Sequence, residues 1–342
     1  MSNENYNNNF TSAKVSPPPL SPTSTIPINK IQSSSSPKNK STVIDLEKND
    51  TFNREEIVDV HYPDQYEETI TANSHPSISR RFDDLVALGR RFRRNNREFL
   101  AEFIGTLILV LLINGVSAEQ RLSVSNGSWL TVAYGNGMAV LFAISICGHI
   151  SGAHMNPAIT VTLWLFSNFP RNRVLSYIIA QIAGAFCGSA LLYTIITPAI
   201  NQFDGGTRSI LGDTGTATIF ATYPPLYVGI GTAIASEVIG TGLLALLVMT
   251  TGHPQNRPFC SIQGVIVATG VSSILLSIGY TSGFSLNPAR DIGPRIFTAV
   301  AGWGLEVFII SDYYALVPMF APFLGSLVGG TVYTIFIDHA SD

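Results

Sequence analysis

The chain has 342 residues, of which 46% are hydrophobic and only 13% are charged, and its mean hydropathy is positive. The charged fraction is about half of the roughly 25% that soluble domains carry, so the composition argues against an ordinary soluble protein. The net charge of -3 is small, but more than half of the charged residues lie in the first hundred positions, and the remainder is nearly continuous apolar sequence.

Residues 1–97 are predicted to form a disordered cytoplasmic tail. Asn-rich, Pro-rich and Ser-rich patches follow one another at 3–9, 17–19 and 33–36. They show no helical or strand period, and such composition buries too little apolar surface to offset the entropy of the chain. Residues 1–40 also lack the apolar stretch that a signal peptide requires.

A basic cluster ends this tail just before the first apolar run. A nucleic-acid partner is not expected, because a basic patch of that kind would accompany a folded binding module and none is visible. Basic residues beside a membrane span instead indicate a cytoplasmic end, and they suit anionic lipid headgroups. The cluster consists of Arg80, Arg81, Arg90, Arg91, Arg93, Arg94 and Arg97.

Six long apolar runs follow, and each is close to the ~20 residues that a helix needs to cross a bilayer. Only helices satisfy their own backbone groups in lipid, so the sequence predicts an all-α membrane protein with six transmembrane helices. Frequent glycines within the runs suit close helix packing. The runs cover about 98–118, 129–149, 174–199, 227–251, 259–280 and 312–337.

Charges in the linkers are consistent with both termini being cytoplasmic. Basic residues follow spans two and four, where Arg171, Arg173 and Arg257 would lie on the cytoplasmic side. The outer linkers show no basic excess. The first of them contains a glycosylation sequon at Asn126.

Two further apolar segments, 157–166 and 288–300, are too short to cross. Ten residues of helix extend only ~15 Å, about half of the hydrocarbon core. Each segment starts with Asn-Pro-Ala, and Asn as N-cap with Pro at the first position is a helix start. We expect two re-entrant half-helices that end in the membrane.

The two halves of the region resemble each other. Glu102 begins EFIGT in the first half, and Glu237 begins EVIGT in the second. The first Asn-Pro-Ala lies in SGAHMNPA and the second in SGFSLNPA, and the copies of the two motifs stand at nearly equal separations along the chain. Three spans separate the copies, so the second half is inverted, and the N-termini of the half-helices should meet near the bilayer centre. Repeat one covers about 98–200 and repeat two about 227–338.

The sequences SGAHMNPAIT and SGFSLNPARDIGPRIF, together with the Glu in spans one and four, resemble the paired signature of the aquaporin superfamily over residues 98–338. The resemblance implies a passive channel for water and small uncharged solutes that excludes protons and ions. It also implies a homotetramer in the plasma membrane, without cofactor or enzymatic activity. A strict water channel, a proton-coupled transporter and a non-conducting structural protein are the alternatives.

The resemblance also assigns roles to single residues. The amides of Asn156 and Asn287 would donate to molecules in the pore, and Arg290 would repel cations in an outer constriction. Glu102 and Glu237 would accept backbone N–H groups of the re-entrant loops, whereas a transporter would use them as proton relays. The two motifs comprise Asn156, Pro157, Ala158, Asn287, Pro288 and Ala289.

By family position the selectivity filter consists of Asn136, Leu275, Phe284 and Arg290. Water channels usually have an aromatic residue at the first position and His at the second, and the missing His should widen the filter. Glycerol facilitators, in turn, often have Trp at the first position and Gly at the second, so this filter matches neither type.

Four residues near the second half-helix and in the last span resemble the glycerol-facilitator branch, namely Asp291, Arg295, Pro318 and Met319. Glycerol is therefore the favoured solute, and urea, hydrogen peroxide and other small polyols stay open. No metal site is expected. His154 has no partner at ligand spacing, and Cys147, Cys187 and Cys260 suggest buried apolar side chains.

Overall fold

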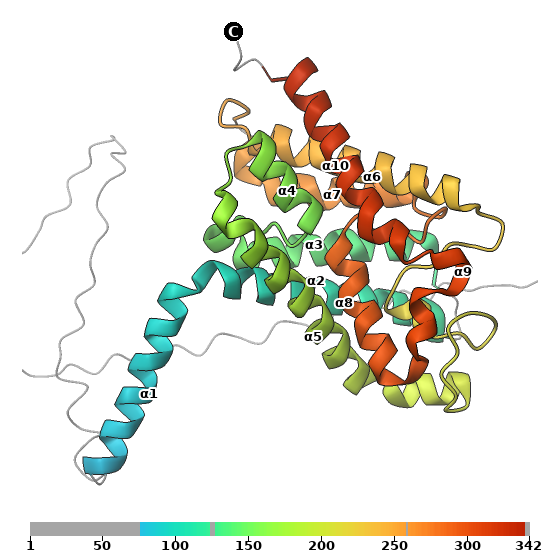
Figure 1. Cartoon of the computed structure of the whole chain (residues 1–342), viewed down its shortest axis with the longest axis horizontal. Coiled ribbons are helices and arrows are strands. Elements are labelled where there is room, and N and C mark those ends of the chain that lie inside the picture. The colour runs from blue at the N-terminus through green and yellow to red at the C-terminus, as the bar shows by residue number, and fades with distance from the viewer. Residues whose placement is uncertain (1–75, 124–126, 258, 339–342) are drawn as a thin grey trace, which may run out of the picture. The chain divides into compact units, whose positions relative to one another are not determined.

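The structure is a computed structural model that describes residues 76–123, 127–257 and 259–338 (Figure 1). Within these residues the chain is built from helices, which confirms the all-α membrane class. Six described segments are long and apolar enough to span a membrane, and each lies within a few residues of a predicted span. They are α2 (Arg97–Leu122), α3 (Trp129–Ser151), α5 (Arg171–Asp204), α6 (Ile230–Gly252), η3 with α7 (Phe259–Ile278, α7 being Gln263–Ile278) and α9 with α10 (Ile310–Phe336, α10 being Leu316–Phe336).

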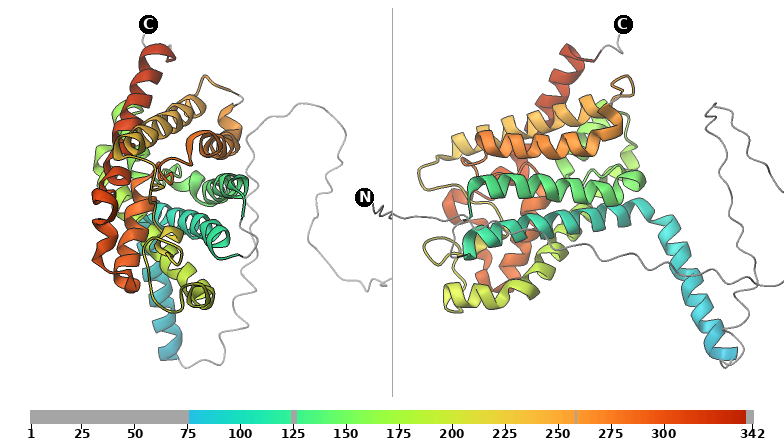
Figure 2. Two further views of the ribbon diagram at one scale, coloured as in Figure 1. Left: turned by 90° about the vertical axis from the view of Figure 1, so that its right-hand side faces the viewer. Right: turned by 180° about the vertical axis from the view of Figure 1, so that it is seen from behind.

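The six spanning segments pack in the same pattern in each half. Helix α2 packs on α3 and α5, and α6 packs correspondingly on α7 and α10. The contact between α3 and α7 joins the halves, and Figure 2 shows α2, α3, α7 and α6 side by side in one layer. The inverted repeat predicted from the sequence is therefore visible as two matching sets of helix contacts.

Glycines permit the closest of these contacts. A Cβ atom on Gly184 of α5 would collide with the carbonyl oxygen of Phe103 on α2. In the second half, a Cβ atom on Gly325 of α10 would collide with the carbonyl oxygen of Val238 on α6. Such backbone proximity replaces the hydrophobic effect as a source of packing energy between helices in lipid.

The two half-helices lie between the spanning segments. Helix α4 (Pro157–Phe166) has the predicted bounds, and α8 (Pro288–Thr298) continues into a π-helical turn, η4 (Ala299–Trp303). Helix α4 packs mainly on α10, while α8 packs mainly on α5. Each half-helix is thus held chiefly by a helix of the opposite repeat, so neither half of the bundle is complete alone.

The prediction of disorder for residues 1–97 is wrong at its end, because residues 76–95 form helix α1 (Pro76–Asn95). At about 100° per residue, Phe82, Leu88 and Phe92 lie on one side, and Arg90, Arg91 and Arg94 lie opposite them. The composition of the whole tail conceals this period. The remainder of the predicted tail, residues 1–75, lies outside the described residues, and so does Asn126 of the sequon.

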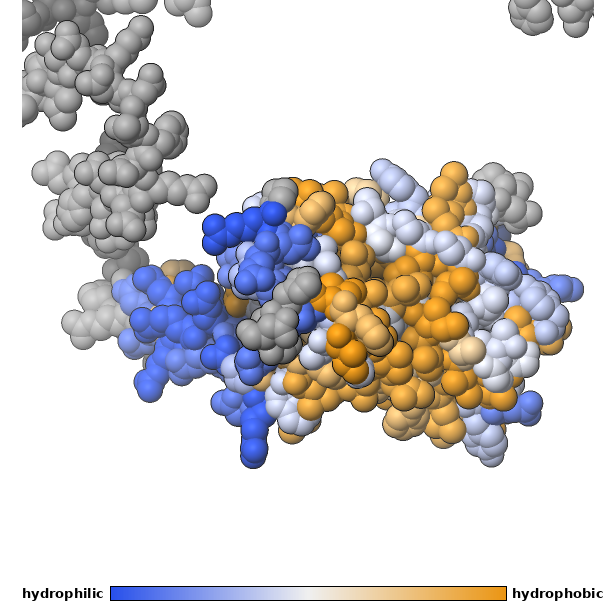
Figure 3. Space-filling model, turned by 90° about the horizontal axis from the view of Figure 1, so that it is seen from above, coloured by the Kyte–Doolittle hydropathy of each residue, from blue (hydrophilic) through white to orange (hydrophobic). Residues whose placement is uncertain are grey.

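Large apolar side chains cover the outside of the bundle. They include Leu175 and Ile195 on α5 and Phe320 on α10, each with about two thirds of its surface exposed. Figure 3 shows hydrophobic residues across the middle of the bundle and hydrophilic residues at its two ends. Patches of this extent are not stable in water, so this surface fits the hydrocarbon core of a bilayer.

We expect Gly184→Ala to lower the thermal unfolding midpoint of the detergent-solubilised protein. The added methyl group forces α5 away from α2, and overpacking of this kind costs about 1–3 kcal/mol. Gly231→Ala is the matched control, since a Cβ atom at Gly231 on α6 meets no atom within 4 Å. An equal shift for both variants would contradict the close helix contact.

Candidate pore

Two cavities lie in opposite halves of the bundle. We call "inner" the half in which α2 begins and "outer" the half in which α2 ends. The inner cavity reaches Val248 and Gln263, and the outer cavity reaches Gln120 and Thr218. Four residues line both cavities, and they are the four that family position assigned to the filter: Asn136, Leu275, Phe284 and Arg290.

The half-helices meet through Asn156 and Asn287. The Oδ1 atom of each side chain accepts an N–H bond from the first turn of its own helix, at 2.9 Å from Ala158 N and 3.0 Å from Ala289 N. Each Nδ2 atom donates across to the carbonyl oxygen just before the other asparagine, at 2.7–2.8 Å. One N–H of each amide is thereby used, and the second stays available to the cavity that both side chains line.

The carboxylate of Glu102 on α2 holds the loop before α4. It accepts backbone N–H bonds from His154 (2.9 Å) and Met155 (2.7 Å). It also accepts the Ser151 hydroxyl (2.6 Å) and the Gln181 amide (2.7 Å). Both oxygen atoms accept two bonds each, and Glu102 is fully buried. Such a set of donors holds the carboxyl group of Glu102 in a fixed position.

Glu237 on α6 holds the loop before α8 in the same way. Its carboxylate accepts backbone N–H bonds from Ser285 (2.9 Å) and Leu286 (2.8 Å) and the Ser282 hydroxyl (2.8 Å). The geometry in both halves is that of a loop support. In each half the carboxylate meets its own loop and is absent from the residues that line the two cavities.

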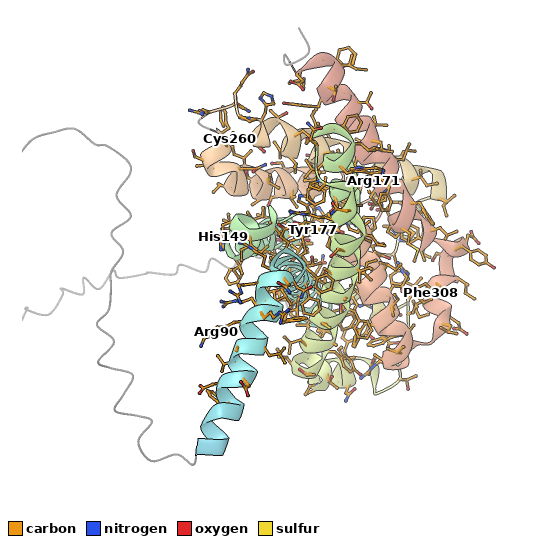
Figure 4. All side chains as sticks on the ribbon, turned by 60° about the vertical axis from the view of Figure 1, so that its left-hand side comes forward. Arg90, His149, Arg171, Tyr177, Cys260 and Phe308 are labelled. Carbon is orange, nitrogen blue, oxygen red and sulfur yellow. The ribbon has the colours of Figure 1, made fainter. Side chains whose placement is uncertain are left out.

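Two tyrosines complete the loop supports and are absent from the sequence-based site. Tyr177 of α5 donates to the carbonyl oxygen of Ser151 at 3.0 Å (Figure 4). Tyr314, which precedes α10, donates to the carbonyl oxygen of Ser282. Their separation along the chain is close to that of the other repeated motifs. A search for matching polar residues at that separation would therefore have found them.

Arg290, in the first turn of α8, is 6% exposed and lines both cavities. Its Nη1 atom donates to the carbonyl oxygen of Phe220 at 2.9 Å. Phe220 directly follows the short helix η2 (Ala217–Ile219). Thr218 of η2 lines the outer cavity. The position of the guanidinium group therefore depends on an outer loop as well as on α8.

A buried ion pair fixes that outer loop. Arg295 Nε lies 2.7 Å from Asp291 Oδ1, and both side chains are fully buried. Asp291 Oδ2 accepts the backbone N–H and the hydroxyl of Thr222, at 2.8 and 2.6 Å. Arg295 donates to the carbonyl oxygens of Thr222 (2.6 Å) and Val307 (2.7 Å). The pair thus links α8 to the segment that holds Arg290, through Thr222, and to the 3-10 helix Leu305–Phe308, through Val307.

The remaining filter residues provide one polar and two apolar surfaces. Asn136 Nδ2 donates to the Val132 carbonyl oxygen at 2.8 Å, and the side chain lines both cavities. The backbone of Leu275 is held by Trp129, whose indole donates to its carbonyl oxygen at 2.9 Å. Phe284 is 5% exposed and has a left-handed backbone with φ of 59°. Its ring faces Gly240 on α6.

The other residues singled out from the sequence have structural surroundings. His154 lines the inner cavity, where its Nδ1 atom lies 3.2 Å from Thr160 Oγ1. Pro318 is buried on α10, and Met319 beside it is partly exposed. Neither residue lines the two cavities. No group of three or more metal-ligating side chains occurs among the described residues.

The three cysteines are free thiols in different surroundings. Cys147 on α3 is buried, as the apolar sequence around it predicts. Cys187 on α5 and Cys260 in η3 are only partly buried, so the expectation of buried side chains is wrong for these two. The Cys260 thiol donates to the carbonyl oxygen of His253 at 2.9 Å, a contact within the linker that joins α6 to α7.

Comparisons with known proteins decide the family. The family model of the major intrinsic proteins matches residues 91–333. The chain belongs to the major intrinsic protein family. It is therefore a membrane channel for water and small solutes and not an enzyme.

Named relatives of this major intrinsic protein include two from fungi. The chain is 61% identical to Aquaporin-2 of Rhizopus delemar over 258 residues, which cover 75% of this chain and 81% of that protein. It is 42% identical to Aquaglyceroporin-2 of Rhizophagus irregularis over 239 residues, covering 69% and 76%. The X-ray structure of the aquaglyceroporin from Plasmodium falciparum matches with a TM-score of 0.63 at 29% identity, covering 70% of this chain and 96% of that one.

We expect Asp291→Asn on α8 to destabilise this channel more than the same change at an exposed aspartate of an outer loop. Removal of one partner leaves the buried Arg295 without its counter-charge, which costs about 3–5 kcal/mol. The measurement is the thermal unfolding midpoint in detergent, with the exposed Asp213→Asn as control. Asp291→Asn combined with Arg295→Met should unfold at a higher temperature than the sum of the two single changes predicts, and strict additivity would contradict a coupled pair.

Proposed function

We propose that this channel conducts glycerol as well as water through a filter of Asn136, Leu275, Phe284 and Arg290. The observation that carries the proposal is that the inner and outer cavities share these four residues. A solute that passes between the cavities has to pass between these side chains. Their chemistry therefore decides which solutes are accepted.

The filter suits a molecule with hydroxyl groups on one side and carbon on the other. Leu275 and Phe284 offer apolar contact, while Asn136 offers an acceptor and Arg290 offers donors. A hydroxyl group both donates and accepts, so glycerol can satisfy both polar residues while its carbon atoms face the apolar pair. The aquaglyceroporin relatives support the same assignment.

The centre of the pore is proposed to exclude protons and cations. Helices α4 and α8 begin at Asn156 and Asn287, and each N-terminus contributes roughly half a positive charge. The free amide N–H groups of the two asparagines would orient a passing water molecule so that it donates away from the centre on both sides. This orientation interrupts the hydrogen-bonded chain along which protons hop, and Arg290 adds a full charge to the barrier.

The inner half is proposed to face the cytoplasm, so that both termini are cytoplasmic. The ion pair between Arg173 and Glu98 brings the start of α5 to the start of α2 (2.7 Å). The His253–Asp338 contact (3.6 Å) brings the α6–α7 linker to the end of α10. The basic residues near these ends support the orientation. We further propose a homotetramer in the plasma membrane, supported by family resemblance.

The test is stopped-flow light scattering on vesicles that contain the purified full-length protein. We expect both water and glycerol to cross faster than in protein-free vesicles, because the filter has apolar and polar sides. Water permeation without a gain for glycerol would make the protein a strict water channel. Glycerol accumulation driven by a pH gradient would indicate a coupled transporter and contradict a passive pore.

We expect Leu275→Ala to raise the ratio of glycerol to water permeability in the same assay, because a shorter side chain widens the filter. Leu276→Ala is the matched control, since Leu276 is 46% exposed on the outside of α7 and absent from both cavities. An unchanged ratio for Leu275→Ala, with normal protein content in the vesicles, would place the selective constriction elsewhere.

A further inference from the structure

Helix α1 has a face that no part of the described bundle covers. Phe82, Leu88 and Phe92 are 67%, 64% and 57% exposed. They lie within a sector of about 120° of the helix, and the contacts of α1 with the bundle are concentrated on α2. Three large exposed apolar side chains on one side of a helix are unfavourable in water, so this face requires an occupant.

The opposite face of α1 is strongly basic. Arg90, Arg91 and Arg94 fall within a sector of about 100° that is centred opposite the apolar one. All three are exposed. Figure 4 shows Arg90 on α1, whose C-terminal end alone reaches the bundle. An apolar face combined with an arginine-rich face is the pattern of helices that lie in a membrane interface.

The chain also places α1 beside the membrane. The Asn96 N–H donates to the Phe92 carbonyl oxygen (3.0 Å), and the Leu100 N–H donates to the Asn96 carbonyl oxygen (2.9 Å). Helical hydrogen bonding thus runs from the end of α1 through the junction into α2, with no flexible spacer between them. Because the apolar part of α2 begins at Phe99, the C-terminal turns of α1 lie at the membrane surface.

We propose that α1 binds the surface of the cytoplasmic leaflet, with Phe82, Leu88 and Phe92 among the acyl chains and its arginines against anionic phospholipid headgroups. The apolar face, the arginine-rich face and the position beside the membrane together favour anionic lipid as the occupant. The arginines at 90, 91, 93, 94 and 97 outnumber Asp83 and Asp84 in the same stretch, and the cytoplasmic leaflet carries anionic lipid. The helix would then be an anchor that fixes where the N-terminal tail leaves the membrane.

The test uses the full-length protein with its three native cysteines replaced and a spin label at one new cysteine. Leu88→Cys and Phe92→Cys report on the apolar face, and the matched controls Asp84→Cys and Arg91→Cys report on the polar face. In vesicles that contain phosphatidylserine, we expect labels at 88 and 92 to collide mainly with oxygen, which dissolves in lipid. Labels at 84 and 91 should collide mainly with a water-soluble nickel chelate.

Two comparisons separate lipid from other occupants. In pure phosphatidylcholine vesicles the contrast between positions 92 and 91 should shrink severalfold. It should shrink likewise in phosphatidylserine when Arg90, Arg93 and Arg94 are changed to Glu, but not with Arg171→Glu, a basic residue at the start of α5. Protection of position 92 from both reagents would mean that protein covers the face, and equal nickel access at 92 and 91 would mean that α1 lies in water. Either result would overturn the proposal.

Discussion

The fold depends on two buried carboxylates that satisfy irregular backbone in the middle of a membrane protein. Hydrocarbon offers no partners for N–H groups, so a chain that turns at mid-depth has to find them in the protein. Glu102 and Glu237 supply them, each to two successive backbone N–H groups. The non-glycine residues Met155 and Leu286 have φ of 47° and 50°. A left-handed backbone of this kind is strained, and it persists where surrounding bonds fix it.

That constraint also explains how the two asparagines come to face each other. Each loop is held from behind by its own carboxylate, and each half-helix packs mainly on a helix of the other repeat. The carbonyl groups of Met155 and Leu286 then point across the centre, where the opposite asparagine amide binds them. The central geometry is a consequence of long-range packing, because no local sequence preference could bring two helix starts from opposite halves of the chain into contact.

Local features of this arrangement were predictable from the sequence, and cross-chain contacts were not. The start of α4 at Pro157 and that of α8 at Pro288 follow from Asn-Pro-Ala, since capping and a fixed φ are properties of adjacent residues. The pairing of the Tyr177 hydroxyl with the carbonyl group of Ser151 depends on how α5 packs. Helix α1 was missed for a different reason, because the amphipathic period of one helix disappears when composition is averaged over the whole predicted tail.

The filter residues were located by family position, and the structure adds why Arg290 keeps its charge available. Asp291, its neighbour, is bonded on both oxygens to Arg295, while Arg290 donates to a neutral carbonyl group. The acid next to Arg290 in the sequence is thus paired with Arg295. A bidentate bond to Arg295 is stronger for the Asp291 carboxylate than a single hydrogen bond would be. The guanidinium group of Arg290 therefore stays available to the pore.

The two repeats differ at the positions that surround Arg290. When the two Asn-Pro-Ala motifs are aligned, Arg290 corresponds to Ile159 and Asp291 corresponds to Thr160. In the inner half, Gln181 donates to Thr160 Oγ1 at 3.0 Å as well as to Glu102. When the two loop-supporting tyrosines are aligned, the counterpart of Gln181 is Pro318, whose side chain donates nothing.

Thr160 is thus bonded from α5, whereas Asp291 is bonded to Arg295 of its own helix. The counterpart of Arg295 is Trp164, which is 40% exposed on the outside of the bundle. The inner half therefore has a neutral contact where the outer half has a buried ion pair. That pair holds the loop that positions Arg290, so the asymmetry between the two halves reaches the filter through Asp291 and Arg295.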